Sequence, residues 1–64
     1  MPFKLKGLRV AMGIQQKEFA KQLGITPQYL NRIERGVVEP RRDLMIKISK
    51  SLNTPVQELF FNED

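Results

Sequence analysis

Two short helical segments joined by a glycine constrain the fold of this chain more than any other feature of it. In residues 16–23, apolar side chains recur three and four positions apart, which is the spacing of one face of an α-helix. Gly24 suits the tight turn that ends this segment, because glycine adopts a left-handed backbone without steric cost. Thr26 and Pro27 then favour a new helix start, since Thr caps a helix and Pro at the first position loses no needed hydrogen bond. Residues 16–35 therefore predict a helix-turn-helix.

Three further segments have the same helical spacing. Residues 3–12 and residues 43–52 each repeat apolar positions on one face. Thr54 and Pro55 repeat the helix-start signal, and Gln57 is placed to complete a capping box at the beginning of a short last helix. The sequence thus predicts five short helices.

The length of 64 residues allows one hydrophobic core, so we expect a single domain over residues 1–64. Because its predicted elements are helices, we expect that domain to be all-α. No segment shows the sustained alternation of apolar and polar residues that a strand would need. The side chains expected in the core are Leu5, Leu8, Met12, Phe19, Ala20, Leu23, Ile25, Leu30, Ile33, Leu44, Met45, Ile48, Leu52, Leu59 and Phe60.

Several functions are excluded by the residue types that are missing. The chain contains no Cys and no His, which rules out disulfides and the usual zinc ligands. We also find no Gly-rich phosphate loop and no pair of carboxylates placed to converge on an apolar pocket, so we expect no enzyme, no cofactor and no metal. No apolar run approaches the roughly 20 residues of a membrane span, and the N-terminal residues lack the apolar core of a signal peptide.

The charge is distributed unevenly along the chain, which carries a formal net charge of +4. All 11 Lys and Arg lie in residues 1–50, whereas residues 51–64 contain only acidic charges. A basic body with an acidic end suits a polyanionic partner that contacts the body. A solvated basic surface without a partner is the alternative interpretation of the same charges.

Polar and basic side chains occupy the outer face of the second helix of the pair, residues 27–35. The major groove of DNA admits an α-helix, and each base pair presents a distinct pattern of donors and acceptors there. Gln pairs with adenine and Arg with guanine through two hydrogen bonds each. The residues of this face are Gln28, Tyr29, Asn31, Arg32 and Arg35.

The chain resembles the Cro-and-repressor (XRE-like) helix-turn-helix regulators of phages and bacteria. The residues that carry this resemblance are Gln16, Phe19, Ala20, Leu23, Gly24, Ile25, Ile33, Glu34, Arg35, Gly36 and Pro40. The resemblance covers residues 4–60 and implies a compact five-helix, phage-repressor-like fold. It further implies a repressor that binds a two-fold operator in double-stranded DNA as a homodimer, in the cytoplasm of a bacterium or from a phage, associated with the nucleoid.

The same resemblance assigns roles to individual residues. Gln28 and Arg32 match the main base-reading positions, with Pro27, Tyr29 and Asn31 beside them, although Pro27 offers no polar group. Tyr29 is expected either along the DNA backbone, where it can also touch a thymine methyl, or packed against the preceding helix.

Phosphate contacts are expected from the start of the helix pair and from the loop that follows it. Gln16 matches a family glutamine that binds a phosphate and also braces the side chain at position 28. The complete set of phosphate-binding residues expected is Gln16, Lys17, Arg35, Arg41 and Arg42.

Two pairs of residues have structural roles by resemblance. Arg9 and Glu34 match a salt bridge between the first and third helices, with a phosphate contact as the alternative role of Arg9. Val56 and Phe61 are the apolar residues left for a dimer interface, unless Phe61 folds back near Phe3.

A protein-binding module is the alternative function, because antitoxin-like proteins and proteins that cap a regulator share this fold. Such a module is expected to carry an apolar patch on its third helix, and residues 27–35 are polar and basic there. We expect no small-molecule effector, because the sequence ends soon after the fifth helix.

Overall fold

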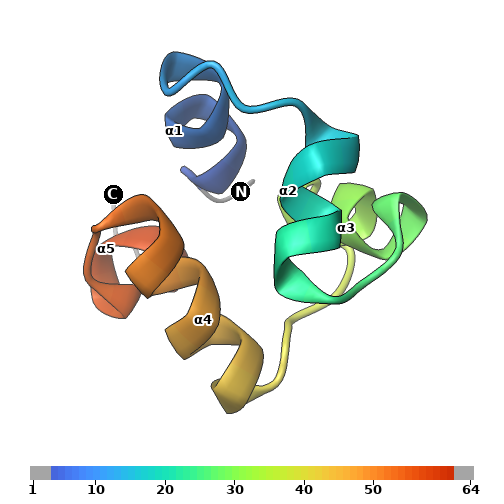
Figure 1. Ribbon diagram of the computed structural model, residues 1–64. Coiled ribbons are helices and arrows are strands. Elements are labelled where there is room, and N and C mark those ends of the chain that lie inside the picture. The colour runs from blue at the N-terminus through green and yellow to red at the C-terminus, as the bar shows by residue number, and fades with distance from the viewer. Residues whose placement is uncertain (1–3, 62–64) are drawn as a thin grey trace.

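The computed structural model describes residues 4–61, and in them five α-helices follow one another with short connections (Figure 1). The helices are α1 (Leu5–Ala11), α2 (Gln16–Leu23), α3 (Pro27–Glu34), α4 (Arg42–Leu52) and α5 (Val56–Phe60). The all-α, five-helix prediction is confirmed. Figure 1 shows α2 and α3 together on one side of the molecule, α4 and α5 on the other, and α1 above them.

The turn between α2 and α3 has the chemistry that the sequence predicts. Gly24 has a φ of 76°, in the left-handed region where glycine carries no strain. Two residues later, the Thr26 hydroxyl accepts a hydrogen bond from the backbone amide of Tyr29 at 3.1 Å, and Pro27 occupies the first position of α3. The connection is therefore short and has little conformational freedom.

The start of α5 differs from its prediction. Pro55 is the residue directly before α5, and no side chain accepts a hydrogen bond from the first backbone amides of this helix. The expected capping box is therefore absent. The Thr54 hydroxyl instead donates to the carbonyl of Leu52 at 3.0 Å, which closes the end of α4. Asn53 ends α4 with a φ of 53°, as a C-terminal cap commonly does.

The core lies where the inner faces of all five helices meet. Its buried hydrophobic residues are Leu5, Phe19, Ala20, Leu23, Leu30, Ile33, Ile48, Leu52, Leu59 and Phe60. The predicted core was wrong for Met12, which is 50 % exposed because α1 ends at Ala11 and Met12 belongs to the turn that follows. Leu8, Ile25, Leu44 and Met45 pack at the edge of the core and are half-buried.

One lysine joins α4 to the helix pair. The Lys47 Nζ atom donates to the carbonyl of Leu23 at 3.4 Å, in the last turn of α2. Its ammonium group lies at the C-terminal end of α2, where a positive charge is favourable. The contact adds a polar link between α4 and α2 beside the apolar core.

A buried salt bridge ties α1 to the end of α3. Arg9 and Glu34 are 6 % and 2 % exposed. Arg9 Nε donates to Glu34 Oε2 at 2.6 Å, and Arg9 Nη2 donates to Glu34 Oε1 at 3.2 Å. The remaining Arg9 Nη1 atom donates to the carbonyl of Ile14 at 2.7 Å. The guanidinium is thus engaged inside the protein, which disfavours the alternative phosphate role of Arg9.

We expect the replacement Glu34→Leu to lower the free energy of unfolding by about 3 kcal/mol or more, because it leaves the Arg9 charge buried without its partner. The double variant Arg9→Met/Glu34→Leu should recover most of that loss, since no unpaired charge remains. Urea denaturation measures both. The matched control is Glu39→Leu at an exposed loop position, with an expected change within about 0.5 kcal/mol. A Glu34→Leu protein as stable as the control would contradict the role given to the ion pair.

Candidate nucleic-acid interface

The burial pattern of α3 divides this helix into an inner and an outer face. Leu30 and Ile33 are fully buried, whereas Gln28 and Arg32 are exposed. Because a helix turns by about 100° per residue, Gln28 and Arg32 lie one above the other, one turn apart. Arg35, directly after the helix, is exposed as well. Together Gln28, Arg32 and Arg35 form what we call the outer ridge.

The residues on either side of the outer ridge differ in their surroundings. Pro27 is exposed at the start of α3 and offers no donor or acceptor side-chain group. Tyr29 is half-buried and packs at the edge of the core, beside a hollow of about 460 Å³. The packed alternative for Tyr29 is thus the one that its environment favours. The hollow is lined by Ile25, Tyr29, Arg41, Asp43, Leu44 and Lys47.

The opposite flank of the outer ridge carries a polar network. Asn31 is half-buried, and its Oδ1 atom accepts a hydrogen bond from Gln16 Nε2 at 3.4 Å. The same Gln16 Nε2 atom donates to Glu34 Oε1 at 3.0 Å. Gln16 therefore braces Asn31 and Glu34, rather than Gln28 as the resemblance implied. Asn31 and Glu34 lie three residues apart on α3, so the sequence places them on one face of the helix, but it does not indicate that Gln16 of α2 meets that face.

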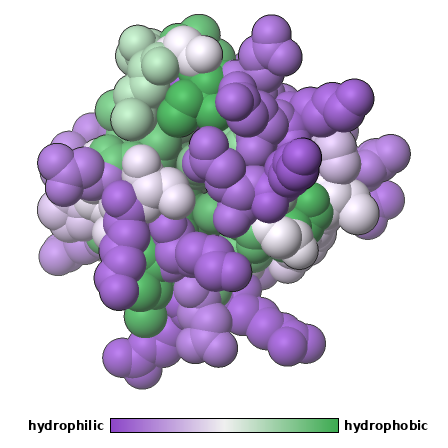
Figure 2. Space-filling model, viewed as in Figure 1, coloured by the Kyte–Doolittle hydropathy of each residue, from purple (hydrophilic) through white to green (hydrophobic). Residues whose placement is uncertain are grey.

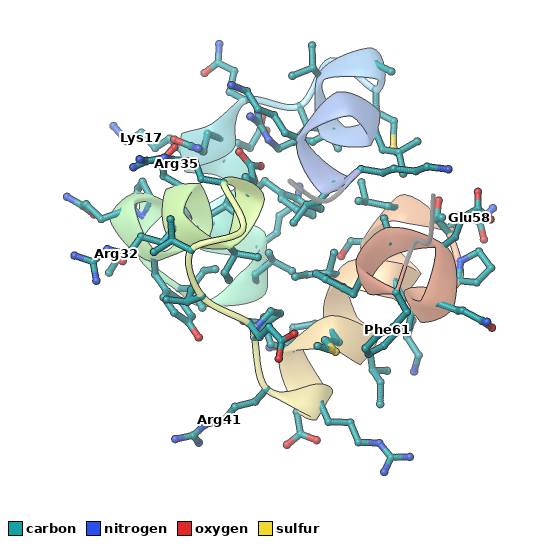
Figure 3. All side chains as sticks on the ribbon, turned by 180° about the vertical axis from the view of Figure 1, so that it is seen from behind. Lys17, Arg32, Arg35, Arg41, Glu58 and Phe61 are labelled. Carbon is teal, nitrogen blue, oxygen red and sulfur yellow. The ribbon has the colours of Figure 1, made fainter. Side chains whose placement is uncertain are left out.

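The cations expected at phosphates do not all lie on one side. Figure 3 shows Lys17, Arg32 and Arg35 extending from the α2–α3 side of the molecule, away from Glu58 and Phe61. Arg41 lies just before α4 and lines the hollow that contains Tyr29.

The structure separates Arg42 from the other expected phosphate ligands. Arg42 lines a groove between α4 and α5, whose other lining residues are apolar. Arg41, its neighbour in the chain, lines the hollow on the side of the helix pair instead. Successive helical residues point in directions about 100° apart, so two adjacent arginines at the start of α4 need not serve one partner.

The groove between α4 and α5 has a largely apolar lining. It has a volume of about 460 Å³ and is lined by Arg42, Met45, Ile46, Val56 and Phe61. Phe61 is 55 % exposed and Val56 is half-buried. The alternative contact of Phe61 with Phe3 concerns a residue outside the described range. Met45 and Ile46 were not predicted here, because the periodicity of α4 indicates which residues face the core and not which line a groove.

Figure 2 shows how the exposed apolar atoms are distributed in the view of Figure 1. They gather mainly over α1, at the top, while the α2–α3 side is mostly hydrophilic. Val10, in α1, is 57 % exposed. The outer ridge lies toward the far side of this view, and its three exposed residues are all polar, as a surface that meets a polyanion requires.

Residues 4–61 contain no cluster of three or more acidic, Cys or His side chains that could hold a metal ion. In the same range, no helix has the length and apolar character needed to cross a membrane.

Comparisons with known proteins agree with this geometry. A family described as helix-turn-helix matches residues 5–59. An uncharacterised HTH-type transcriptional regulator of Methanocaldococcus jannaschii is 34 % identical over 64 residues, which cover all of this chain and 97 % of that protein. The regulator YgzD of Bacillus subtilis, also uncharacterised, is 31 % identical with the same coverage.

Two solved structures have the same fold. The restriction-modification controller protein C.AhdI of Aeromonas hydrophila superposes with a TM-score of 0.78 at 30 % identity, over 89 % of this chain and 86 % of that one. The clp gene regulator ClgR of C. glutamicum gives 0.76 at 26 % identity, over 89 % and 74 %. Sequence, fold and the exposed α3 lead to one conclusion: the chain belongs to the Cro/repressor-type (XRE) family of helix-turn-helix transcriptional regulators, which are DNA-binding proteins and not enzymes.

Proposed function

We propose that this regulator is a repressor that binds a two-fold operator as a homodimer, with α3 of each subunit in the major groove. The observation that carries the proposal is the outer ridge. Its amide and guanidinium groups are exposed, and no other group within residues 4–61 hydrogen-bonds to them. A module that binds protein through α3 would need an apolar surface there, and the outer ridge is polar.

Two residues of the outer ridge, Gln28 and Arg32, lie within α3 and contact the bases. Gln28 offers a carboxamide that matches the N6 and N7 edge of adenine, and Arg32 a guanidinium that matches the O6 and N7 edge of guanine. Behind them, the buried Leu30 and Ile33 fix the rotation of α3 about its own axis. The two readers can therefore approach neighbouring base pairs without first ordering the helix.

Phosphate binding falls to the cations around the outer ridge. Lys17, Arg35 and Arg41 are exposed and belong to three different segments of the chain. Such contacts hold the protein in register on the duplex but carry no sequence information themselves. Glu58 lies on the far side of the molecule, so its charge does not oppose the approach of DNA (Figure 3).

The α4–α5 groove is the surface that we assign to the dimer. Phe61 and Val56 lie on it, with Met45 and Ile46 beside them, and the groove faces away from the outer ridge. Complete burial of a phenylalanine contributes roughly 1.5–3 kcal/mol, and pairing can add the share that belongs to the 55 % of Phe61 that is still exposed. A two-fold axis doubles each contact. Pairing here leaves both copies of α3 free for two half-sites.

Repression and the site of action are further parts of the proposal. A protein that occupies an operator overlapping a promoter blocks polymerase without any further activity. The site of action is the DNA itself, in the cytoplasm of a prokaryotic cell. The relatives in Methanocaldococcus and Bacillus widen the possible sources from bacteria and phages to archaea.

Selection of bound sites from random DNA should return a two-fold sequence with half-sites about 10 base pairs apart, centre to centre. On this site, Gln28→Ala and Arg32→Ala should each relax preference at one position per half-site, with a loss of about 1–3 kcal/mol of discrimination, while nonspecific binding persists. Gln22→Ala, at an exposed position of α2, is the control. If both variants select the wild-type site with undiminished preference, these residues do not read bases.

Arg41→Ala should weaken binding to all DNA sequences alike and lower the slope of log K against log salt concentration by about 0.9 per subunit, because one phosphate contact is lost. Titrations at several salt concentrations give this slope. Lys50→Ala removes an exposed positive charge in the last turn of α4, away from both hollows, and is the matched control that should leave the slope unchanged. Equal slopes for the wild type and Arg41→Ala would exclude Arg41 as a phosphate ligand.

Phe61→Lys should convert the dimer to a monomer in sedimentation experiments, because Arg42 also lines the groove and a second positive charge cannot be buried there without a partner. On a two-fold operator this variant should protect single half-sites independently. Val10→Lys, which changes an equally exposed apolar residue in α1, should remain dimeric. A monomeric wild type, or a Phe61→Lys protein that stays dimeric, would show that the groove is not the interface.

A further inference from the structure

We propose that Gln16 is a positioning residue: it orients the Asn31 carboxamide so that the Asn31 NH₂ group faces outward as a donor to a DNA phosphate. The inference rests on the proposed DNA binding of α3. Under this inference Gln16 does not bind a phosphate itself. Asn31 makes the phosphate contact, and Gln16 holds Asn31 in the orientation that the contact needs.

The buried salt bridge determines which groups of the network donate hydrogen bonds and which accept them. Arg9 donates to both carboxylate oxygens of Glu34, at 2.6 and 3.2 Å. An ionised carboxylate only accepts hydrogen bonds, so any further group that approaches it must be a donor. Gln16 lies 3.0 Å from Glu34 Oε1 and must therefore present its NH₂ group there.

The orientation of Gln16 then determines that of Asn31. The Gln16 NH₂ group has two hydrogens, one directed at Glu34 and the other at Asn31 over 3.4 Å. Because Gln16 presents a donor, Asn31 must turn its acceptor atom, Oδ1, toward Gln16. The NH₂ group of Asn31 then points away from Gln16. The free end of the Gln16 amide is its oxygen, which cannot hydrogen-bond to a phosphate oxygen, because both are acceptors.

The position of Asn31 indicates a phosphate rather than a base as its partner. Asn31 is half-buried on the flank of α3 that faces the start of α2, while Gln28 and Arg32 form the outer ridge. When the outer ridge faces the bases, the flanks of the helix face the walls of the groove, which are lined by phosphates. The exposed ammonium of Lys17, next to Gln16 in α2, adds positive charge on the same side.

A double-mutant cycle on DNA binding tests the inference. Asn31→Ala should weaken binding about tenfold on the selected site and on unrelated DNA alike, because a hydrogen bond to a charged group is lost. The salt slope should not change, since a neutral amide releases no counterion. Gln16→Met, which keeps the side-chain length, should weaken binding by a smaller factor, because Asn31 is then free to rotate. The double variant should bind no more weakly than Asn31→Ala alone.

The controls and contrary outcomes are distinct. Gln22→Met makes the same change at an exposed position of α2 and should bind like the wild type. Thermal unfolding of each variant shows whether it is folded at the assay temperature. Additive losses in the cycle would mean that Gln16 makes its own DNA contact, and an unchanged affinity of Asn31→Ala would remove the contact altogether. Either result would overturn the inference.

Nuclear magnetic resonance of the labelled wild type gives a second test that needs no variant. On addition of the selected DNA, the Asn31 side-chain NH₂ signals should shift strongly, while those of Gln16 should move little because they already face inward. The reverse pattern would overturn the inference and leave DNA binding intact. A wild type that binds no DNA would instead defeat the proposed function first, so the two failures are distinguishable.

Discussion

The buried ion pair between Arg9 and Glu34 is the contact on which the geometry of this chain most depends. It joins α1 to the last residue of α3, and each partner is expensive to bury without the other. With 64 residues and neither disulfide nor zinc ligand, the fold has few other ways to fix the direction of its third helix. The pair adds directional specificity to a core that is otherwise held by nondirectional apolar packing.

The same ion pair sets the polarity of the hydrogen bonds around it. Glu34 can only accept, so Gln16 donates to it, and the amide of Asn31 is oriented in turn. A contact that stabilises the fold thus also prepares one edge of the proposed DNA-binding surface. Opposite that edge, Tyr29 packs at the rim of the core, so the two flanks of α3 are held by different physical means.

Much of this architecture was predictable from local signals. Apolar residues at helical spacing, Gly24 and the Thr26–Pro27 start led to the five helices and the helix-turn-helix, because these signals act within a few residues of the chain. The same logic failed for Met12 and for the cap of α5. In both places the end of a helix fell one or two residues from where the pattern placed it, and a helix end depends on backbone hydrogen bonds that periodicity does not encode.

The sequence by itself determined the helices, their inner faces and the polar, basic outer face of residues 27–35, since these depend on spacing and residue type along one helix. Only the tertiary structure decided that Gln16 meets Asn31 and Glu34, and that the adjacent Arg41 and Arg42 line different surfaces. The physical reason is that such contacts depend on how one helix is rotated and placed against another. That placement is fixed by the packing of the whole core and by no single segment.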